Sequence, residues 1–182
     1  KAKEIGVGIH LHVSESQGQV NLAMEEFGKT PVQLCKDAGV MDVPTIFAHC
    51  RAPQEVDFSL MVNAGTGVGV APKTYLKHAG TIAPVDKYIE HGIPFGLATD
   101  GAVSNNTMDI LEQMSLLGML AKQMTADPTF MPVDQLVNIT FRSSAKVIHL
   151  DDQIGELKEG MKADIALVRQ DGLHMTPRTN IL

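Results

Sequence analysis

Residues 5–13, IGVGIHLHV, have the length and the β-branched content of a buried β-strand. Three further short apolar runs follow along the chain: TIFAHC (45–50), GVGVA (67–71) and IPFGLATD (93–100). Because all four runs are almost continuously apolar, we expect strands that are covered on both faces. Strands of this kind are typical of the parallel sheet of an α/β protein.

Stretches with helical signals separate the apolar runs. Pro31 follows Thr30, a pattern typical of a capped first turn, and Gly39 ends that helix. The segment 108–123 repeats apolar residues at helical spacing. The expected helices span residues 19–27, 31–38, 52–64, 85–90, 108–123 and 132–148. Strands that alternate with helices pair in parallel through crossovers, so we expect an α/β fold.

Four strand–helix units amount to half of an eight-stranded (β/α)8 barrel. A half-barrel would leave two parallel edges unpaired, so we expect residues 1–150 to be completed by a partner half, the N-terminal part of the same protein. The pattern of the sequence changes from about Asp151. The stretch IGELKEGMKADIALV (154–168) holds two strand-like runs around a Gly-Met-Lys turn, which predicts the start of a small β-rich domain over residues 151–182.

Each strand run ends in a polar residue: His12, His49, Lys73 and Asp100. The carboxyl ends of parallel strands carry the active sites of barrels and of open α/β sheets, so we expect these side chains to meet at one edge. Burying an aspartate such as Asp100 is costly without a metal or a hydrogen-bonding partner. A functional role for Asp100 is therefore the favoured interpretation.

The first strand run ends in an HxxE pattern, His12 and Glu15. Imidazole is a good zinc ligand, and a carboxylate three residues later can reach the same mouth once the strand gives way to a loop. His10 lies on the same face of the strand, so His10 and His12 are an alternative two-ligand pair. We rank His10 lower and expect it to be a packed histidine, because it lies deeper in the strand.

Composition excludes several classes of function. The 182-residue chain carries a net charge of −6 with scattered Lys and Arg, which argues against a nucleic-acid or anionic-membrane partner. No apolar run approaches the length of a membrane span. Cys35 and Cys50 are the two cysteines, and we expect both to be free thiols in a cytoplasmic protein.

The motifs taken together resemble the amidohydrolase superfamily, and most closely its branch of methylthioadenosine/S-adenosylhomocysteine deaminases and chlorohydrolases. The stretches that carry the resemblance are HVSE (12–15), AHC (48–50), APKTYLKHAGTIAPV (71–85), TDGAVSNNTMDILEQM (99–114), IGELKEGMKADIALV (154–168) and DGLHMTP (171–177). The resemblance implies a TIM-like (β/α)8 barrel of which residues 1–150 are strands 5–8. It also implies that residues 151–182 are part of a β-sandwich domain.

The resemblance further implies a role for each matching residue in a metal-dependent hydrolytic deaminase. His12 and Asp100 would be metal ligands, with Zn²⁺ as the expected ion and Fe²⁺ or Mn²⁺ as alternatives. Asp100 would also accept a proton from the attacking water, His49 would orient that water or the substrate, and Glu15 would protonate a ring nitrogen of the heterocyclic substrate. By analogy with the family, a homo-oligomer is expected.

Two departures from the family pattern bear on activity and substrate. The His-x-His of the family's first strand is absent, so His12 and Asp100 supply only two ligands, and we expect this chain alone to hold metal poorly. The loop 70–75 also differs from the family's, which leaves the substrate open. Lys73, Tyr75 and Lys77 are candidate substrate contacts, with a solvated loop as the equal alternative.

Four functions therefore remain under consideration. The leading prediction is deamination of an aminopurine nucleoside or a related N-heterocycle. The alternatives within the enzymes are an s-triazine chlorohydrolase or aminohydrolase and a guanine- or pterin-type deaminase. The alternative from another class is a non-catalytic scaffold of the same fold, which the HVSE, AHC and TDG motifs disfavour.

Overall fold

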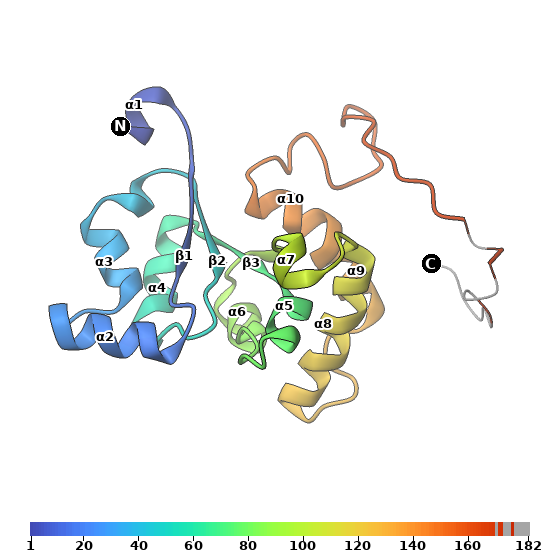
Figure 1. Ribbon diagram of the computed structural model, residues 1–182. Helices are drawn as coiled ribbons and strands as arrows, with labels where there is room; N and C mark the ends of the chain where they lie inside the picture. The colour runs from blue at the N-terminus through green and yellow to red at the C-terminus, as the bar shows by residue number, and fades with distance from the viewer. Residues whose placement is uncertain (170, 173–175, 177–182) are drawn as a thin grey trace.

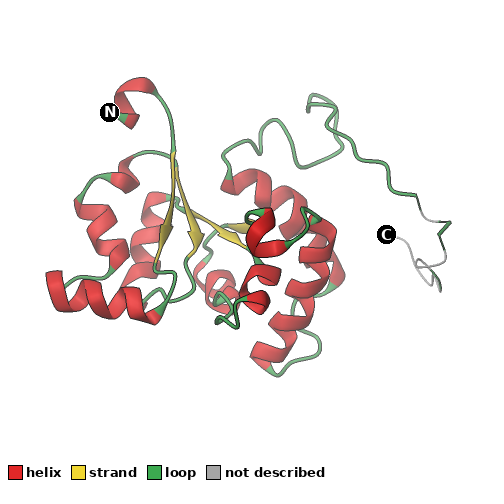
Figure 2. Cartoon of the chain, in the orientation of Figure 1, coloured by secondary structure: helices red, strands yellow, loops and turns green. Residues whose placement is uncertain are grey.

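The computed structural model describes residues 1–169, 171, 172 and 176. Its centre is a parallel sheet in the order β1-β2-β3-β4, so each strand pairs with its neighbour in sequence. The strands are β1 (Ile9–Val13), β2 (Thr45–His49), β3 (Gly67–Val70) and β4 (Phe95–Leu97). This arrangement confirms the expected α/β class with parallel crossovers (Figure 2).

Helices flank the sheet and alternate with its strands (Figure 1). Before β3 lie α1 (Ala2–Ile5), α2 (Gln17–Phe27), α3 (Pro31–Asp37), the 3-10 turn η1 (Val40–Asp42) and α4 (Glu55–Ala64). After β3 lie α5 (Pro72–Lys77), α6 (Val85–His91), α7 (Ala102–Asn105), α8 (Ile110–Thr125), α9 (Val133–Asn138), the π-helical turn η2 (Ile139–Ser143) and α10 (Ser144–Val147). Helices α3, α4, α6 and α8 contact one another in turn and form a continuous layer.

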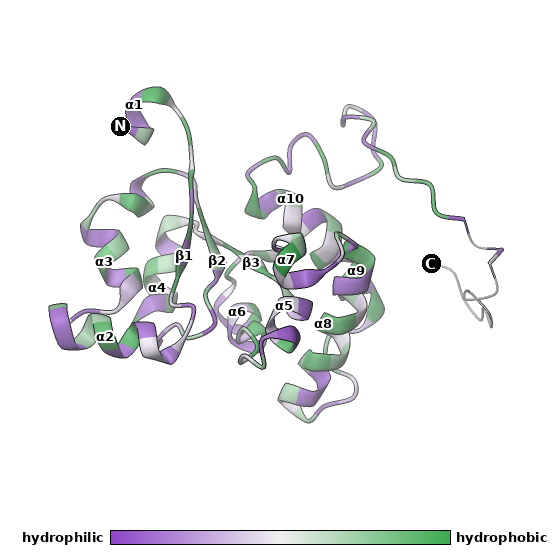
Figure 3. Ribbon diagram, viewed as in Figure 1, coloured by the Kyte–Doolittle hydropathy of each residue, from purple (hydrophilic) through white to green (hydrophobic). Residues whose placement is uncertain are grey.

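The two faces of the sheet differ in burial. Phe47, Val68 and Phe95 are buried in the core beneath the helices, where hydrophobic residues gather along the strands (Figure 3). On β1, His10 and His12 are exposed and line a cavity of about 1410 Å³. We expected β1 to be covered on both faces and His10 to be packed, whereas in the described part of the chain no residue covers this face of β1.

The predicted element ends differ from the observed ones where loops carry the site. The fourth strand was expected over 93–100 but ends at Leu97, so Asp100 lies in the loop after β4. The helices α5 and α7 were not predicted, since each is a short turn without an apolar repeat. The helix expected over 132–148 is continuous but contains the π-helical turn η2.

The segment 154–168 forms no strand in the described part of the chain, contrary to its two strand-like runs. A turn is closed there by the bond from the Lys162 N–H to the Gln153 carbonyl (2.8 Å). Ile165 and Leu167 are exposed, because no strand lies beside them to pair with. The assignment of residues 151–182 to a β-sandwich stays a prediction, and residues 173–175 and 177 of the DGLHMTP stretch lie outside the described residues.

A buried polar contact joins α3 to α4. Thr30 caps α3 by accepting from the Gln33 N–H (3.1 Å), and its hydroxyl donates to Asp57 Oδ1 (2.5 Å) in α4. Asp57 is fully buried and also accepts from the Gln54 N–H (2.8 Å), which caps α4. The Asp57 carboxylate therefore caps α4 directly and holds the Thr30 hydroxyl that caps α3.

Replacement of Asp57 by alanine should lower the free energy of unfolding by about 2 to 3 kcal/mol, because the buried Thr30 hydroxyl and the half-buried Gln54 N–H lose their acceptor. Urea denaturation measures this loss. The matched control is Asp152→Ala, an exposed residue, which should change stability by less than about 0.5 kcal/mol. Equal stability of the two variants would contradict the proposed role of the buried carboxylate.

Candidate active site

Three side chains meet at the carboxyl ends of the strands. The rings of His12 (β1) and His49 (the last residue of β2) lie 5.2 Å apart between centroids. His49 Nε2 lies 3.9 Å from Asp100 Oδ2, on the loop after β4. All three line the same cavity. His12 and Asp100 are 88 positions apart in the sequence, yet both lie next to the imidazole of His49.

The backbone at this edge adopts unusual conformations. Ser14, His49, Cys50 and Asp100 all have positive φ, between 41° and 67°. Residues other than glycine rarely adopt this region, and such strain is retained where the surrounding structure enforces it. At the β2 end, the hydroxyl of the buried Tyr88 donates to the Cys50 carbonyl. The strained turn therefore has a buried partner that holds His49 toward the cavity.

His49 is almost completely buried, with 6% of its surface exposed. Burial lowers its pKa, although the charges of Glu15 and Asp100 act in the opposite direction. The ring packs edge-on against Tyr75, and its Nδ1 has no hydrogen-bond partner among the described residues. His49 is therefore a neutral imidazole near pH 7 that can exchange hydrogen bonds with a small molecule in the cavity.

Asp100 is partly exposed and accepts a hydrogen bond from the Gly101 N–H at Oδ1 (2.7 Å). Partial burial raises the pKa of Asp100. The Gly101 hydrogen bond and the nearby His49 act in the opposite direction, and the net shift of the pKa is downward. The carboxylate is thus ionised at neutral pH, with Oδ2 turned toward His49. An ionised carboxylate in this position can bind a cation or accept a proton.

Glu15 lies just beyond β1, and about half of its side chain is exposed. Its backbone N–H donates to Gln19 Oε1 (2.8 Å), which ties the residue to the first turn of α2. Glu15 Oε1 lies 3.9 Å from a terminal nitrogen of Arg51. Sequence reasoning singled out Glu15 but missed Arg51, whose only signal was a charged residue directly after the AHC motif.

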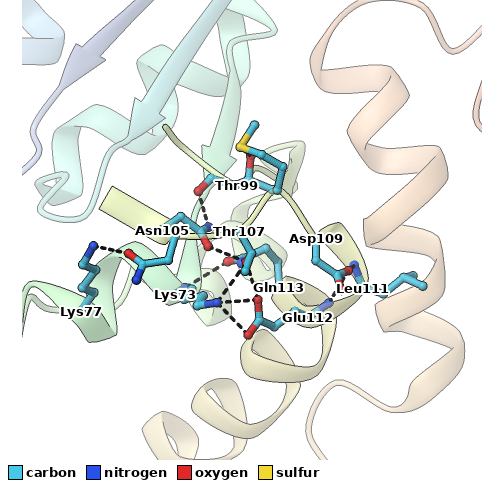
Figure 4. Close-up of polar contacts among 11 residues, drawn as sticks. Lys73, Lys77, Thr99, Asn105, Thr107, Asp109, Leu111, Glu112 and Gln113 are labelled. Atoms are coloured by element: carbon cyan, nitrogen blue, oxygen red, sulfur yellow. Dashed lines mark hydrogen bonds and ion pairs between the residues drawn. The ribbon is translucent and has the colours of Figure 1, made fainter. Parts of the chain in front are cut away.

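A second polar cluster anchors the loop that carries Asp100 (Figure 4). Lys73 Nζ donates to both carboxylate oxygens of Glu112 (2.8 and 2.7 Å) and to Thr107 Oγ1 (3.0 Å). Thr107 Oγ1 also donates to Asn105 Oδ1 (3.1 Å), and the Asn105 amide donates to the Thr99 carbonyl next to Asp100. We call Lys73, Thr107, Glu112, Asn105 and Thr99 the α5–α8 clamp.

The candidate substrate contacts of loop 70–75 are engaged within the protein. Lys73 belongs to the clamp, and Lys77 Nζ donates to the Val103 carbonyl (2.7 Å). Tyr75 is buried, and its hydroxyl accepts from the Ala71 N–H (3.0 Å). Lys73 and Tyr75 are therefore not solvated loop residues, whereas Lys77 is exposed. Substrate contact by these residues stays a prediction. Sequence reasoning missed Glu112, which lies 39 positions from Lys73.

Replacement of Lys73 by methionine should lower kcat of the full-length protein about 10-fold or more, since release of the clamp lets Asp100 move. Steady-state kinetics with the preferred substrate measure this effect. The matched control is Lys87→Met, which removes an exposed lysine–glutamate pair on α6 and should leave kcat within about 2-fold. Equal kcat for the two variants would show that the clamp does not position Asp100.

Comparison with known proteins identifies the family. The model of the amidohydrolase family matches residues 1–181. The chain belongs to the amidohydrolase family. It is 34% identical over 179 residues to a 5-methylthioadenosine/S-adenosylhomocysteine deaminase of Desulforudis audaxviator, covering 98% of this chain and 42% of the relative. It is 36% identical to the protein of that name from Pelotomaculum thermopropionicum, covering 97% of this chain and 41% of the relative.

Two solved structures superpose closely on this chain. The adenosine deaminase of Xanthomonas campestris with bound zinc aligns with a TM-score of 0.91 at 23% identity, over 99% of this chain and 41% of that one, which shows the shared fold. The zinc-bound atrazine chlorohydrolase of Arthrobacter aurescens aligns with a TM-score of 0.86 at 26% identity, over 98% and 40%. The chain thus spans about two fifths of the length of the relatives that it matches.

The donor types at this amidohydrolase site fit zinc, but their number is small. Imidazole and carboxylate are the ligands that zinc prefers in hydrolytic sites, and His12, His49 and Asp100 present both. Within the described residues, however, no group of three or more His, Cys, Asp or Glu side chains is arranged to hold a metal ion. Two ligands are fewer than a catalytic zinc takes from protein, so His12 and Asp100 would hold zinc only together with further ligands.

The cysteines of the amidohydrolase chain take no part in this arrangement. Cys50 is buried next to His49, and burial raises its pKa to about 12. Cys35 is half-buried, and burial raises its pKa as well. A thiol must lose its proton to act as a ligand or nucleophile, so both remain neutral at pH 7.

In the described part of the chain, none of the helices has the length and apolar character needed to cross a membrane.

Proposed function

We propose that this chain is the C-terminal half of a (β/α)8-barrel deaminase that hydrolyses the amino group of an aminopurine nucleoside of the methylthioadenosine/S-adenosylhomocysteine class. The observation that carries the proposal is the meeting of His12, His49 and Asp100 at one strand edge, in a chain 34% identical over 98% of its length to a deaminase of that name. The upstream half of the barrel would supply the remaining metal ligands.

The proposed chemistry assigns a separate task to each side chain. Zinc, when bound, supplies Lewis acidity that allows water to attack at neutral pH. His12 and Asp100 would help to hold the ion. Asp100, ionised and open at Oδ2, accepts a proton from the attacking water, and the neutral His49 orients that water or the substrate by a hydrogen bond.

The proton balance closes with Glu15. Water adds to the ring carbon that bears the amino group while Glu15 delivers a proton to the adjacent ring nitrogen. The carbon–nitrogen bond then breaks as the carbonyl forms, and the proton collected by Asp100 leaves with the amine as ammonia. The hydroxyl proton of the adduct is released in the same step and returns Glu15 to its acid form. Each acid–base group of this kind typically accelerates a reaction about 10²- to 10⁴-fold.

The test is an ammonia- and chloride-release assay with the full-length, zinc-loaded protein. The panel contains methylthioadenosine, S-adenosylhomocysteine, adenosine, guanine, a pterin and atrazine. The highest kcat/KM for an aminopurine nucleoside supports the proposal. The second candidate is an s-triazine hydrolase, which the 26% identity to the atrazine chlorohydrolase supports. A preference for atrazine in the panel would favour this candidate. Absence of turnover on every compound would favour a non-catalytic scaffold.

A further inference from the structure

Arg51 lies beside the candidate active site, next to Glu15. It follows the His49–Cys50 turn, and only 13% of its side chain is exposed. A buried guanidinium must be held by specific contacts, because removing it from water is costly. The contacts of the guanidinium therefore indicate the role of its charge.

Three neighbours fix the position of this guanidinium. Its plane lies over the ring of Tyr75, with the Cζ atom 5.1 Å from the ring centroid, and Nη1 donates to the Thr81 carbonyl (3.1 Å). Gly80 leaves room for it, since a Cβ at that position would lie 2.0 Å from Nη1. Tyr75 is itself buried and held by the Ala71 N–H. The guanidinium therefore has little freedom to move.

The remaining end of the guanidinium is directed at Glu15. Arg51 Nη2 lies 3.9 Å from Glu15 Oε1, which is within ion-pair range but longer than a hydrogen bond. Apart from its backbone N–H, no other hydrogen bond orients Glu15 among the described residues. The Glu15 carboxyl group thus keeps its own hydrogen-bonding capacity, while a fixed positive charge faces it from the turn after β2.

We infer that Arg51 is a positioning residue that holds Glu15 in place for proton delivery to the substrate ring, an inference that rests on the proposed deaminase function. When Glu15 gives up its proton, the carboxylate that forms lies opposite the fixed guanidinium, which stabilises the new charge. Arg51 itself touches no reacting atom. Its contribution passes through Glu15, and this gives the inference a sharp test.

The test is a double-mutant cycle in the full-length, zinc-loaded protein. Arg51→Met should lower kcat about 10- to 100-fold and change KM by less than about 3-fold, because orientation during reaction is lost rather than binding. In the Glu15→Gln background, Arg51→Met should change kcat by less than about 2-fold, since the group it positions is gone. Arg51→Lys should recover part of the loss, as lysine restores the charge without the planar stack.

Gly80→Ala gives an independent variant that keeps the arginine but displaces it. It should lower kcat in the same direction as Arg51→Met and should likewise be silent with Glu15→Gln. The control is Gly18→Ala in α2, where the added Cβ meets only Ser16 Oγ at 3.7 Å, and kcat should be unchanged. Zinc content and melting temperature are measured for every variant, and Gly80→Ala replaces Arg51→Met in the cycle if the latter does not fold.

The outcomes separate the inference from the proposed function. If the wild-type protein releases no ammonia from the panel, the deaminase proposal fails. If the wild type is active and Glu15→Gln impairs it, but Arg51→Met and Gly80→Ala do not lower kcat, only the inference is overturned. An equal loss from Arg51→Met with and without Glu15 would also overturn it, because Arg51 would then act independently of Glu15.

Discussion

Replacement of Asp100 by asparagine is expected to lower kcat of the full-length protein by about 10³-fold or more, within the range for loss of an acid–base group. Asparagine keeps the shape of the side chain, and its Oδ1 can still accept from the Gly101 N–H. The negative charge and the proton-accepting oxygen beside His49 are lost. The loss should therefore appear in kcat, measured by steady-state ammonia release, with the melting temperature nearly unchanged.

The control for this substitution is Asp152→Asn, which changes an exposed aspartate far along the chain and should leave kcat within about 2-fold. Zinc content distinguishes the two tasks assigned to Asp100. A variant that keeps its zinc and still loses activity has lost the proton acceptor, whereas a variant without zinc has lost a ligand. Full activity of Asp100→Asn would show that the carboxylate has neither task.

Replacement of His12 by alanine is expected to weaken zinc binding by more than about 100-fold, since loss of an outer-sphere partner alone costs about 10- to 100-fold. His12 faces the cavity and lies 5.2 Å from His49 between ring centroids. Removal of one imidazole leaves too few donors for a hydrolytic zinc site. Metal content by atomic emission, together with activity in excess zinc, measures the effect.

Two matched variants sharpen this experiment. His78→Ala removes an exposed imidazole outside the cavity and should change neither zinc content nor activity. His10→Ala tests the alternative two-ligand pair, because His10 lies on the same face of β1 and lines the same cavity. A loss of zinc on replacement of His10 but not of His12 would reverse the assignment of the ligand.

Local sequence patterns predicted most of the architecture. The four apolar runs predicted the four strands, because a short β-branched run is stable when it is buried in a sheet. The alternation with helices predicted parallel pairing, since a crossover is needed to bring successive strands side by side in the same direction. The strand ends then identified His12, His49 and Asp100. The parallel pairing of β1 with β2 places His12 beside His49, whereas the loop after β4 brings Asp100 to the same imidazole.

Contacts between distant segments could not be predicted in the same way. The ion pair of Arg51 and Glu15 joins the ends of two strands, and the clamp joins Lys73 to a glutamate 39 positions away. Nothing local distinguishes these charged residues from solvated ones. Their partners depend on the packing of α5, α7 and α8, and two of those helices were not expected from the sequence.

The amino-acid sequence by itself determined the class of the fold, the order of its strands and the family, because these depend on periodicity and on short motifs. Only the tertiary structure decided which charged groups are held and where the backbone is strained. The positive φ of His49 and the fixed guanidinium of Arg51 arise from long-range packing, in which Tyr88 and Tyr75 act from other elements. Local propensity contains no record of such contacts, since they form only when separate segments are brought together.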